Sequence, residues 1–420
     1  RWLQLLCLSL VLMRCQPLRR ALYFYRGYMV FQSDLNEYCQ TYLVKKENVP
    51  EPSPWSFLRD TEKTNQSIFE QFMLFDRVSF KVYGENIPLI ILINKFGLKG
   101  VEALLEQDAI NFVLWNHMVT YMVDEIKGVE PLQSGTLTSP AHSDPEESLS
   151  LGFGWLAKPL RTSSKKNLIR KTRDKYTILD SNLSAKSVQL AKSSYNSGKL
   201  KIYGLDPELS SYIDLNKSGR EKLCSCASEI LLYSYLMNNN ISTYDNFEFY
   251  NIFNESVDKI NKSKKVLNNY NVLSKVENIP NAASIYNQLE NPFDKLIKIR
   301  NKNNSKKFRK WLSDNSSTEQ DITKSYIDSI VNSKGFFETK KGKLTKSIAM
   351  TAIGGAIGGA IAGPGGAVGG AGALKLLEPA ADIALDMLDE FVLSGLTKGW
   401  TPKMYFDDLG KLQNITKTSR

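Results

Sequence analysis

Histidine is scarce in this chain of 420 residues, which contains His117 and His142 and no others. With only two histidines, a Ser-His-Asp triad or a histidine-rich metal centre is disfavoured. The five cysteines are odd in number and irregular in spacing, which excludes a disulfide framework and the usual zinc-binding pattern. This cysteine usage fits a reducing compartment, and we expect a cytoplasmic protein. The cysteines are Cys7, Cys15, Cys39, Cys224 and Cys226.

Familiar catalytic motifs are also missing. The chain has no phosphate-binding GxxxxGK[ST] loop and no GxSxG nucleophile elbow. The G-x-x-x-G repeats within residues 354–359 do not match a dinucleotide fingerprint, because no strand is predicted before them and Asp382 and Asp386 lie further along the chain than the acidic residue of the fingerprint. An acidic metal site built from distant residues stays open. We therefore predict no cofactor, name no catalytic, cofactor-binding or metal-binding residue, identify no small-molecule substrate, and favour a protein that is not an enzyme.

Positive charge is what the chain has in excess: its net charge is +10 and its isoelectric point is near 9.1. Such a balance favours an anionic partner, either nucleic acid or anionic lipid. From residue 182 onward, however, Lys occurs mixed with Asn and Ser, as around the run Asn238-Asn239-Asn240. A solvated surface of biased composition explains much of the charge equally well.

The densest cationic segment lies between residues 158 and 175. It could hold phosphates, but no interleaved aromatic residues and no recognised nucleic-acid-binding motif accompany it. Two interpretations stay open: a solvated basic surface and an anion-binding face. The candidate anion-binding residues are Lys158, Arg161, Lys165, Lys166, Arg170, Lys171, Arg173 and Lys175.

Residues 348–374 form the most distinctive stretch, which has 27 residues without a charged side chain, ten of them Gly and eight Ala. A run of this length satisfies the requirement for a membrane span. Its glycines recur at four-residue spacing, which on a helix would expose bare backbone along one face and let a partner helix approach closely. These glycines are Gly354, Gly355, Gly358, Gly359, Gly363, Gly365, Gly366, Gly369 and Gly370.

Pro364 and the glycines beside it interrupt this stretch near its middle, and this combination favours a turn. The pattern predicts a helical hairpin with arms at residues 344–362 and 367–395. The stretch resembles the glycine-zipper segments of many unrelated membrane-inserting proteins, a likeness of composition that assigns no residue roles. Three interpretations follow: insertion into a membrane, packing inside a soluble helical domain, and a disordered glycine-rich tract. Recurring Ile, Ala and Val disfavour the third.

Hydrophobic periodicity predicts the remaining elements. Strands are expected at residues 77–83, 110–115 and 121–126, and Gly97 is expected to separate a helix at 87–96 from one at 98–107. His117 falls between two predicted strands with no second ligand nearby, so we interpret it as structural. Further helices are expected at 220–237, 247–270, 282–289, 293–300, 306–312 and 321–331, and Tyr405 and Phe406 are expected to dock on the core.

These elements predict a mainly α fold with a small α+β module and a C-terminal Gly/Ala-rich helical hairpin. Residues 1–28 are interpreted as an upstream extension, with Met29 as the natural start. The α+β module is expected at 29–127, a loop and basic linker at 128–183, a helical domain at 184–343, the hairpin at 344–395 and a tail at 396–420.

The favoured function is that of a bacterial-type cytoplasmic protein whose hairpin associates with or inserts into membrane, as an effector or toxin would. Membrane lipid, and a second copy contacted through the glycine face, are the expected partners. The first alternative is a soluble interaction or regulatory protein whose hairpin packs in its own core. The second is nucleic-acid binding through the basic segment, and nucleic acid is the less favoured partner.

Overall fold

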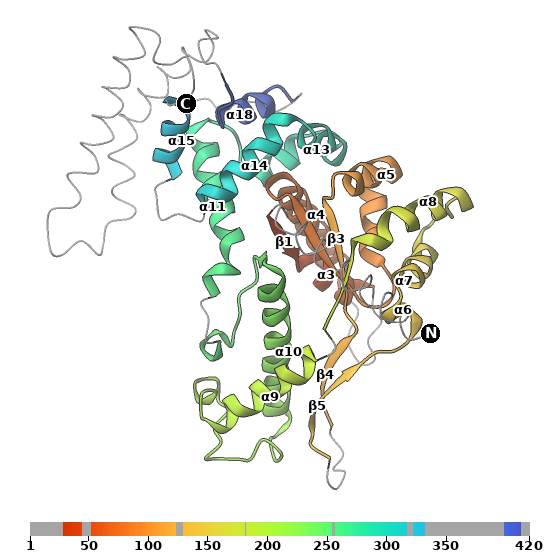
Figure 1. The fold of residues 1–420 in the computed structure, drawn as a ribbon, viewed down its shortest axis with the longest axis vertical. Helices are drawn as coiled ribbons and strands as arrows, with labels where there is room; N and C mark the ends of the chain where they lie inside the picture. The colour runs from red at the N-terminus through yellow and green to blue at the C-terminus, as the bar shows by residue number, and fades with distance from the viewer. Residues whose placement is uncertain are drawn as a thin grey trace, which may run out of the picture. The chain divides into compact units, whose positions relative to one another are not determined.

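The computed structural model describes residues 28–43, 52–122, 129–180, 182–253, 257–316, 322–331 and 399–412. These residues form two compact units, each assembled from several segments of the chain (Figure 1). Helices predominate, as predicted for a mainly α fold with a smaller sheet-containing part. Within the described residues, unit 1 takes Arg1–Ser33, Phe75–Asn86 and Leu105–Ile260, and unit 2 takes Asp34–Leu74, Ile87–Leu104 and Asn261–Arg420.

Unit 1 contains a five-stranded sheet in which every neighbouring pair of strands is parallel, in the order β6-β3-β2-β1-β7. A separate two-stranded antiparallel ribbon joins β4 (His117–Tyr121) to β5 (Leu132–Thr136). The strands of the parallel sheet are β1 (Met29–Gln32), β2 (Arg77–Val82), β3 (Ile110–Leu114), β6 (Tyr176–Ile178) and β7 (Ile241–Thr243).

The composition of the inner strands explains their place in the sheet. Parallel sheets are covered on both faces, so their strands are apolar along their whole length rather than at alternate positions. All residues of β1 and of β3 are buried, and β2 is interrupted by partly exposed residues at Arg77 and Lys81. The edge strands β6 and β7 have three residues each and carry too little pattern to be recognised from sequence.

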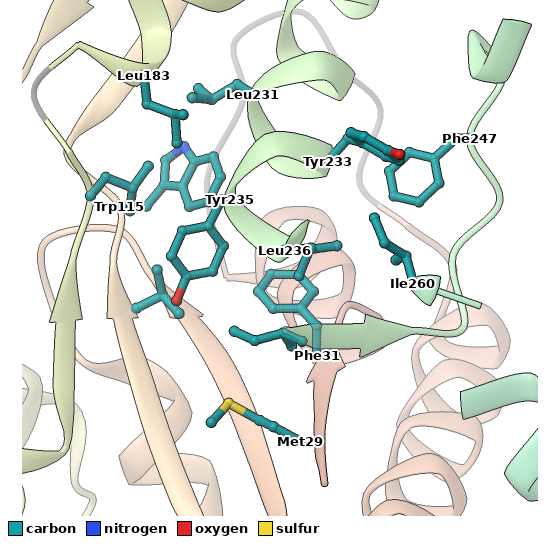
Figure 2. Close-up of a cluster of buried hydrophobic side chains, with 13 residues drawn as sticks. Met29, Phe31, Trp115, Leu183, Leu231, Tyr233, Tyr235, Leu236, Phe247 and Ile260 are labelled. Carbon is teal, nitrogen blue, oxygen red and sulfur yellow. The ribbon is translucent and has the colours of Figure 1, made fainter. Parts of the chain in front are cut away.

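Helix α10 (Lys217–Asn239) packs against one face of this sheet. The Asn216 side chain caps its first turn by accepting a hydrogen bond from the Gly219 amide at 2.9 Å. Asn240 ends it in the left-handed conformation, with φ of 52°. Figure 2 shows the buried apolar cluster between helix and strands, which includes Phe31, Val113 and Trp115 of the sheet side and Leu231, Tyr235 and Leu236 of α10.

The other face of α10 packs against α9 (Leu183–Asn196) and the β4–β5 ribbon in a second apolar cluster. Ala191 of α9 and Ala227 of α10 are fully buried there, because small side chains let the two helices approach closely. The remaining helices of unit 1 lie between β5 and β6 in the sequence. They are α6 (Pro140–Ser143), α7 (Pro145–Gly152) and α8 (Thr162–Thr172).

Unit 2 is helical. An aromatic core joins α4, α5 and α13: the Phe72 and Phe96 rings lie 5.5 Å apart between centroids, and those of Phe96 and Phe293 lie 4.7 Å apart. Its helices are α3 (Asp34–Tyr42), α4 (Pro54–Leu74), most of α5 (Ile87–Glu106), α11 (Lys262–Val276), α12 (Ala282–Gln288), α13 (Pro292–Arg300), α14 (Asn303–Asn315), α15 (Ile322–Val331) and α18 (Lys403–Gly410).

Helix α18 is fastened to unit 2 by both ionic and aromatic contacts. Lys403 Nζ lies 2.9 Å from Glu277 Oε2, with both side chains less than a tenth exposed at 5% and 7%. The Tyr326 hydroxyl of α15 donates to the other Glu277 oxygen at 2.6 Å. Tyr405 stacks on Phe308 of α14 at 4.0 Å between ring centroids. These contacts hold α18 against α11, α14 and α15.

Much of the predicted secondary structure is confirmed. Strands β2 and β3 occupy the predicted segments, and α10, α12, α13, α14 and α15 overlap the predicted helices. Gly97 interrupts α5 with φ of 67°, a conformation that favours glycine. Tyr405 and Phe406 are buried, as expected for residues that dock on the core.

Two local predictions differ from the structure. Of the strand expected at 121–126, Tyr121 is the last residue of β4, and residues 123–126 lie outside the described residues. The helix expected at 247–270 begins at Lys262, and two short 3-10 turns precede it. Residues 128–183, expected to be loop and linker, contain β5, α6, α7, α8 and strand β6 of the main sheet. These short elements are stabilised by tertiary packing rather than by a local hydrophobic period, so the sequence pattern does not reveal them.

The predicted hairpin, with arms at 344–362 and 367–395, and the upstream segment 1–27 lie outside the described residues. Among the helices that are described, none combines the length and the apolar character needed to cross a membrane. That finding concerns the described ranges and leaves the glycine-rich stretch as a prediction.

The buried ion pair of α18 yields a stability prediction. Replacing Lys403 by Met should lower the free energy of unfolding of unit 2 by about 3 kcal/mol, because it leaves the Glu277 carboxylate buried without its cation. Lys302→Met is the matched control: Lys302 pairs with Asp408 on the same helix but is 43% exposed, so its loss should cost less than about 1 kcal/mol. Urea denaturation followed by circular dichroism measures both. Equal losses in the two variants would contradict the prediction.

Candidate functional site

Of the two sets of candidate residues predicted from the sequence, the structure describes the cationic set but not the glycines. The glycines Gly354, Gly355, Gly358, Gly359, Gly363, Gly365, Gly366, Gly369 and Gly370 lie outside the described residues. The cationic segment is described, and it forms the end of one loop, helix α8 and the turn before strand β6.

The cations of this segment divide into paired and unpaired groups. Lys171 contacts Glu106 at 2.8 Å, Arg173 contacts Glu146 at 2.9 Å and Lys175 contacts Asp108 at 2.7 Å. These three hold the segment against its own unit. Within the ranges that the structure describes, no carboxylate pairs with the other candidates, so the number of cations that could meet an anion is smaller than the sequence suggested. Those others are Lys158, Arg161, Lys165, Lys166 and Arg170.

The topology of the parallel sheet indicates a different location for a ligand-binding site. The chain proceeds from β1 through β2 and β3 to β6 in one direction, then returns to place β7 on the opposite side of β1. In open parallel sheets, ligands bind beyond the carboxyl ends of the strands near such a reversal. The relevant edge of the sheet is therefore where β1, β2, β3 and β7 end.

Lys81, the penultimate residue of β2, stands near this edge. Alternation along the strand and the register with β1 and β3 place Ser79 and Lys81 on the face that α10 covers, together with Phe31 and Val113. A lysine without a hydrogen-bond partner is costly on a face that contributes residues to an apolar cluster. Its presence there requires a physical explanation.

Two aromatic rings contact the Lys81 amine. Its Nζ lies 3.9 Å from the centre of the Trp115 ring and 4.5 Å from the centre of the Tyr83 ring. Trp115 is buried, whereas Tyr83 is 41% exposed, so one ring belongs to the core and the other reaches solvent. The face of an aromatic ring attracts a cation and supplies a flat apolar surface. The amine thus lies between a ring of the core and a ring that reaches solvent, and the residue as a whole is partly exposed.

Burial lowers the pKa of Lys81 to about 7, and the carboxylate of Asp245 opposes this change only in part. Asp245 follows β7 and is fixed by Thr243, whose Oγ1 donates to Asp245 Oδ2 at 2.8 Å and accepts from the Asp245 amide at 3.1 Å. Near neutral pH about half of the Lys81 amine is therefore unprotonated. An unprotonated amine is a nucleophile and a base, and its protonated form binds anions.

Other polar residues on the same face satisfy one another. Asn111 Nδ2 donates to Ser79 Oγ at 3.0 Å, and Thr177 Oγ1 donates to Asn111 Oδ1 at 3.4 Å. These hydrogen bonds form a row across β2, β3 and β6. Lys81 does not belong to the row and donates no hydrogen bond to another described residue. It is the polar group of this face that remains available to a ligand.

The loop after β2 is rigidly held, which fixes Tyr83 beside Lys81. Gly84 turns the chain with φ of 67°, and a side chain there would meet the His142 ring at 3.0 Å. The Asn86 amide donates to Ser148 O at 3.0 Å. Gly152 is required beside it, because a Cβ would lie 3.0 Å from the Asn86 carbonyl oxygen. The backbone of α7 thereby fastens the loop that carries the exposed ring.

His117 is structural, as we interpreted it from the sequence. Its Nε2 lies 2.8 Å from Asp180 O and its Nδ1 lies 3.2 Å from Thr136 Oγ1, so both ring nitrogens have partners. In the part of the chain that the structure describes, no three His, Cys, Asp or Glu side chains gather as a metal site would require.

Sequence reasoning missed Lys81, Trp115 and Asp245 because they lie far apart in the chain. One signal was present: Arg-Val-Ser-Phe-Lys-Val places a lysine within a predicted strand that is otherwise rich in β-branched and aromatic residues. No protein-family model, no curated protein and no solved structure matches this chain. A functional interpretation has to come from the geometry described above.

The pKa of Lys81 yields a prediction about stability and pH. Its folded value of about 7 lies below the unfolded value of about 10.4, so between these pH values the unfolded chain binds more protons and the free energy of unfolding rises with pH. Relative to Lys81→Met, the parent should gain about 1–2 kcal/mol from about pH 7 to about pH 9, allowing for partial screening.

Urea denaturation of both proteins at the two pH values measures this difference. Lys166→Met, which removes an exposed lysine, serves as the control and should run parallel to the parent. A parent and a Lys81→Met variant whose stabilities change equally with pH would show that Lys81 titrates as an ordinary surface lysine.

Proposed function

We propose that unit 1 binds a small organic molecule at the carboxyl edge of its parallel sheet, and that Lys81 contacts the ligand's anionic or carbonyl oxygen. The observation that carries this proposal is the Lys81 amine, half-buried against the Trp115 and Tyr83 rings at the end of an inner strand. The ligand expected for such a site has a flat apolar part that packs on the rings and an oxygen that meets the amine.

A purely structural role for Lys81 is less consistent with its surroundings. Contacts with aromatic rings and the nearby Asp245 carboxylate both favour the ammonium form. The pKa nevertheless falls, so the surroundings as a whole disfavour the charge and Lys81 costs stability at neutral pH. Groups that are retained at a cost, at the sheet edge where α/β proteins bind ligands, are candidates for function.

Benzoate is a suitable probe, because it combines one aromatic ring with one carboxylate. The parent should bind it at about pH 6, where Lys81 is protonated, and several-fold more weakly at about pH 9, where the ammonium has lost its proton. Lys81→Met should lose the pH-dependent part of the binding. Saturation-transfer NMR titrations with the full chain measure both.

Lys95→Met is the matched control, since Lys95 is another half-buried lysine whose pKa is lowered by burial, but it belongs to unit 2. It should bind benzoate as the parent does. Benzyl alcohol, which has the same ring without the charge, should bind without the pH dependence. A parent that binds no benzoate, or a Lys81→Met variant that binds it equally well, would overturn the proposal.

The described ends of the interval 332–398 favour a second proposal, which concerns the glycine-rich stretch. Tyr326 of α15 and Phe406 of α18 lie 6.2 Å apart between ring centroids, and Tyr326 and Lys403 both bind Glu277. Helices α15 and α18, which flank the interval in the sequence, therefore contact each other and the same part of unit 2. The Gly-Pro-Gly-Gly sequence at 363–366 falls at the middle of this interval. Fastened, adjacent ends support the proposal that 348–374 forms a hairpin that associates with membrane lipid.

Adjacent ends also permit a clean deletion. Replacing residues 335–398 by a short Gly/Ser linker should leave unit 2 folded, because the ends to be joined already lie close together. The parent should float with anionic vesicles at about 0.5 M salt, where exposed charges are screened, and the linker variant should not.

Lys165→Glu combined with Lys166→Glu is the control for charge, and this double variant should still float at high salt because both residues are outside the replaced segment. If the linker variant floats as well as the parent, the glycine-rich stretch is not the membrane-binding element.

A further inference from the structure

The surroundings of the Lys81 amine are suited to covalent chemistry as well as to binding. The amine donates no hydrogen bond to another described residue, so no neutral acceptor competes for its protons or orients it away from a ligand. The titratable side chains near it are Asp245 after β7, Tyr83 in the loop after β2, and Tyr235 of α10, whose ring lies 5.9 Å from that of Trp115. Among these, Asp245 is the carboxylate, a group that can act as a general base.

We propose that the molecule bound at this site carries an aldehyde or ketone, and that the Lys81 amine bonds to its carbonyl carbon to form an imine. This inference rests on the function proposed for unit 1 and adds the reactive group of the ligand. Its geometric basis is an amine held against two aromatic rings near the carboxyl end of an inner strand of a parallel sheet, within range of the charge of a fixed carboxylate.

The atoms of the reaction balance without an oxidant or reductant. The Lys81 nitrogen lone pair attacks the carbonyl carbon, a C–N bond forms, and the carbonyl π electrons move to oxygen, which takes up a proton. The nitrogen loses one proton to give a carbinolamine, and the hydroxyl group takes up a proton and leaves as water. The protonated imine that remains then loses the second nitrogen proton to give the imine. In the proposed reaction Asp245, whose charge acts on Lys81 and whose Oδ2 is held by Thr243, receives the proton from nitrogen through a bridging water and returns it to the departing oxygen.

The protonation state of Lys81 distinguishes it from other lysines of the chain. At pH 7 an exposed lysine with a pKa of about 10.4 is neutral in about one molecule of 2,500, whereas a lysine with a pKa of about 7 is neutral in about half. Because the neutral amine is the nucleophile, the site supplies a reactive group without a separate base. A site that merely bound anions would gain from a permanent guanidinium instead.

Benzaldehyde with sodium cyanoborohydride tests the proposal on the full-length chain, since the reductant traps any imine as a stable benzyl-lysine. Peptide mapping by mass spectrometry then gives the extent of labelling at each lysine. At about pH 7, Lys81 should be labelled about 10- to 100-fold faster than the exposed Lys166, because its larger neutral fraction outweighs the lower nucleophilicity of a less basic amine.

The ratio of the two labelling rates provides a readout that needs no variant. It should fall by about 50-fold between about pH 7 and about pH 9, as the neutral fraction of exposed lysines rises and Lys81 has no further proton to lose.

Asp245→Asn should slow labelling at Lys81 while leaving labelling at Lys95 unchanged. Lys81→Met should abolish the fast phase, and near-ultraviolet circular dichroism checks that this variant is folded.

The outcomes separate this inference from the function on which it rests. If benzoate binds in a Lys81-dependent manner but Lys81 is labelled no faster than Lys166, the imine is wrong and ligand binding stands. If benzoate does not bind and Lys81 is not preferentially labelled, both proposals are wrong. Fast labelling that is confined to Lys81 and follows the predicted ratio with pH supports the imine.

Discussion

Parallel strand pairing is the constraint on which this architecture depends. Neighbouring parallel strands cannot be joined by a tight hairpin, so each connection must cross over and return to the same end of the sheet. The connections from β1 to β2 and from β2 to β3 contain α3, α4 and α5, which belong largely to unit 2. Unit 2 is consequently built from three separate segments of the chain. The two units therefore do not correspond to two successive stretches of the sequence.

The same pairing determines where polar residues are tolerated. An inner parallel strand has both faces covered, so each polar side chain on it must find a partner or carry a cost. Ser79, Asn111 and Thr177 meet this requirement by hydrogen-bonding across three strands. Lys81 meets it incompletely, through two aromatic rings and a nearby carboxylate, and its lowered pKa is the consequence.

Unit 2 shows how a distant segment can be held by a few buried groups. The Glu277 carboxylate accepts a hydrogen bond from Tyr326 and pairs with Lys403, which joins elements on either side of the interval 332–398. Aromatic stacking of Tyr405 on Phe308 adds apolar burial to this ionic contact. Such an arrangement fastens the described elements on either side of the interval to one part of unit 2. Ligand binding in unit 1 and membrane association from unit 2 are independent proposals, because they rest on different residues.

Whether a helix or strand could be predicted from the sequence depended on its length and on the periodicity of its apolar residues. Long helices such as α10, with apolar residues at helical spacing, and the kink at Gly97 were predictable because local side-chain pattern and backbone freedom decide them. Strands β6 and β7, of three residues each, were not predictable, because their pairing with β3 and β1 links positions up to about 200 residues apart.

The candidate site likewise depends on contacts between residues that are far apart in the sequence. The sequence by itself determined the mainly helical composition, the inner strands β2 and β3, the scarcity of histidine and the uncharged glycine-rich stretch, since all of these are properties of residues close together in the chain. Only the tertiary structure brought Lys81, Trp115 and Asp245 to one edge of a sheet. The reactivity of Lys81 comes from burial and from neighbours supplied by other strands, and the pKa of a side chain depends on what surrounds it in space rather than on what precedes it in sequence.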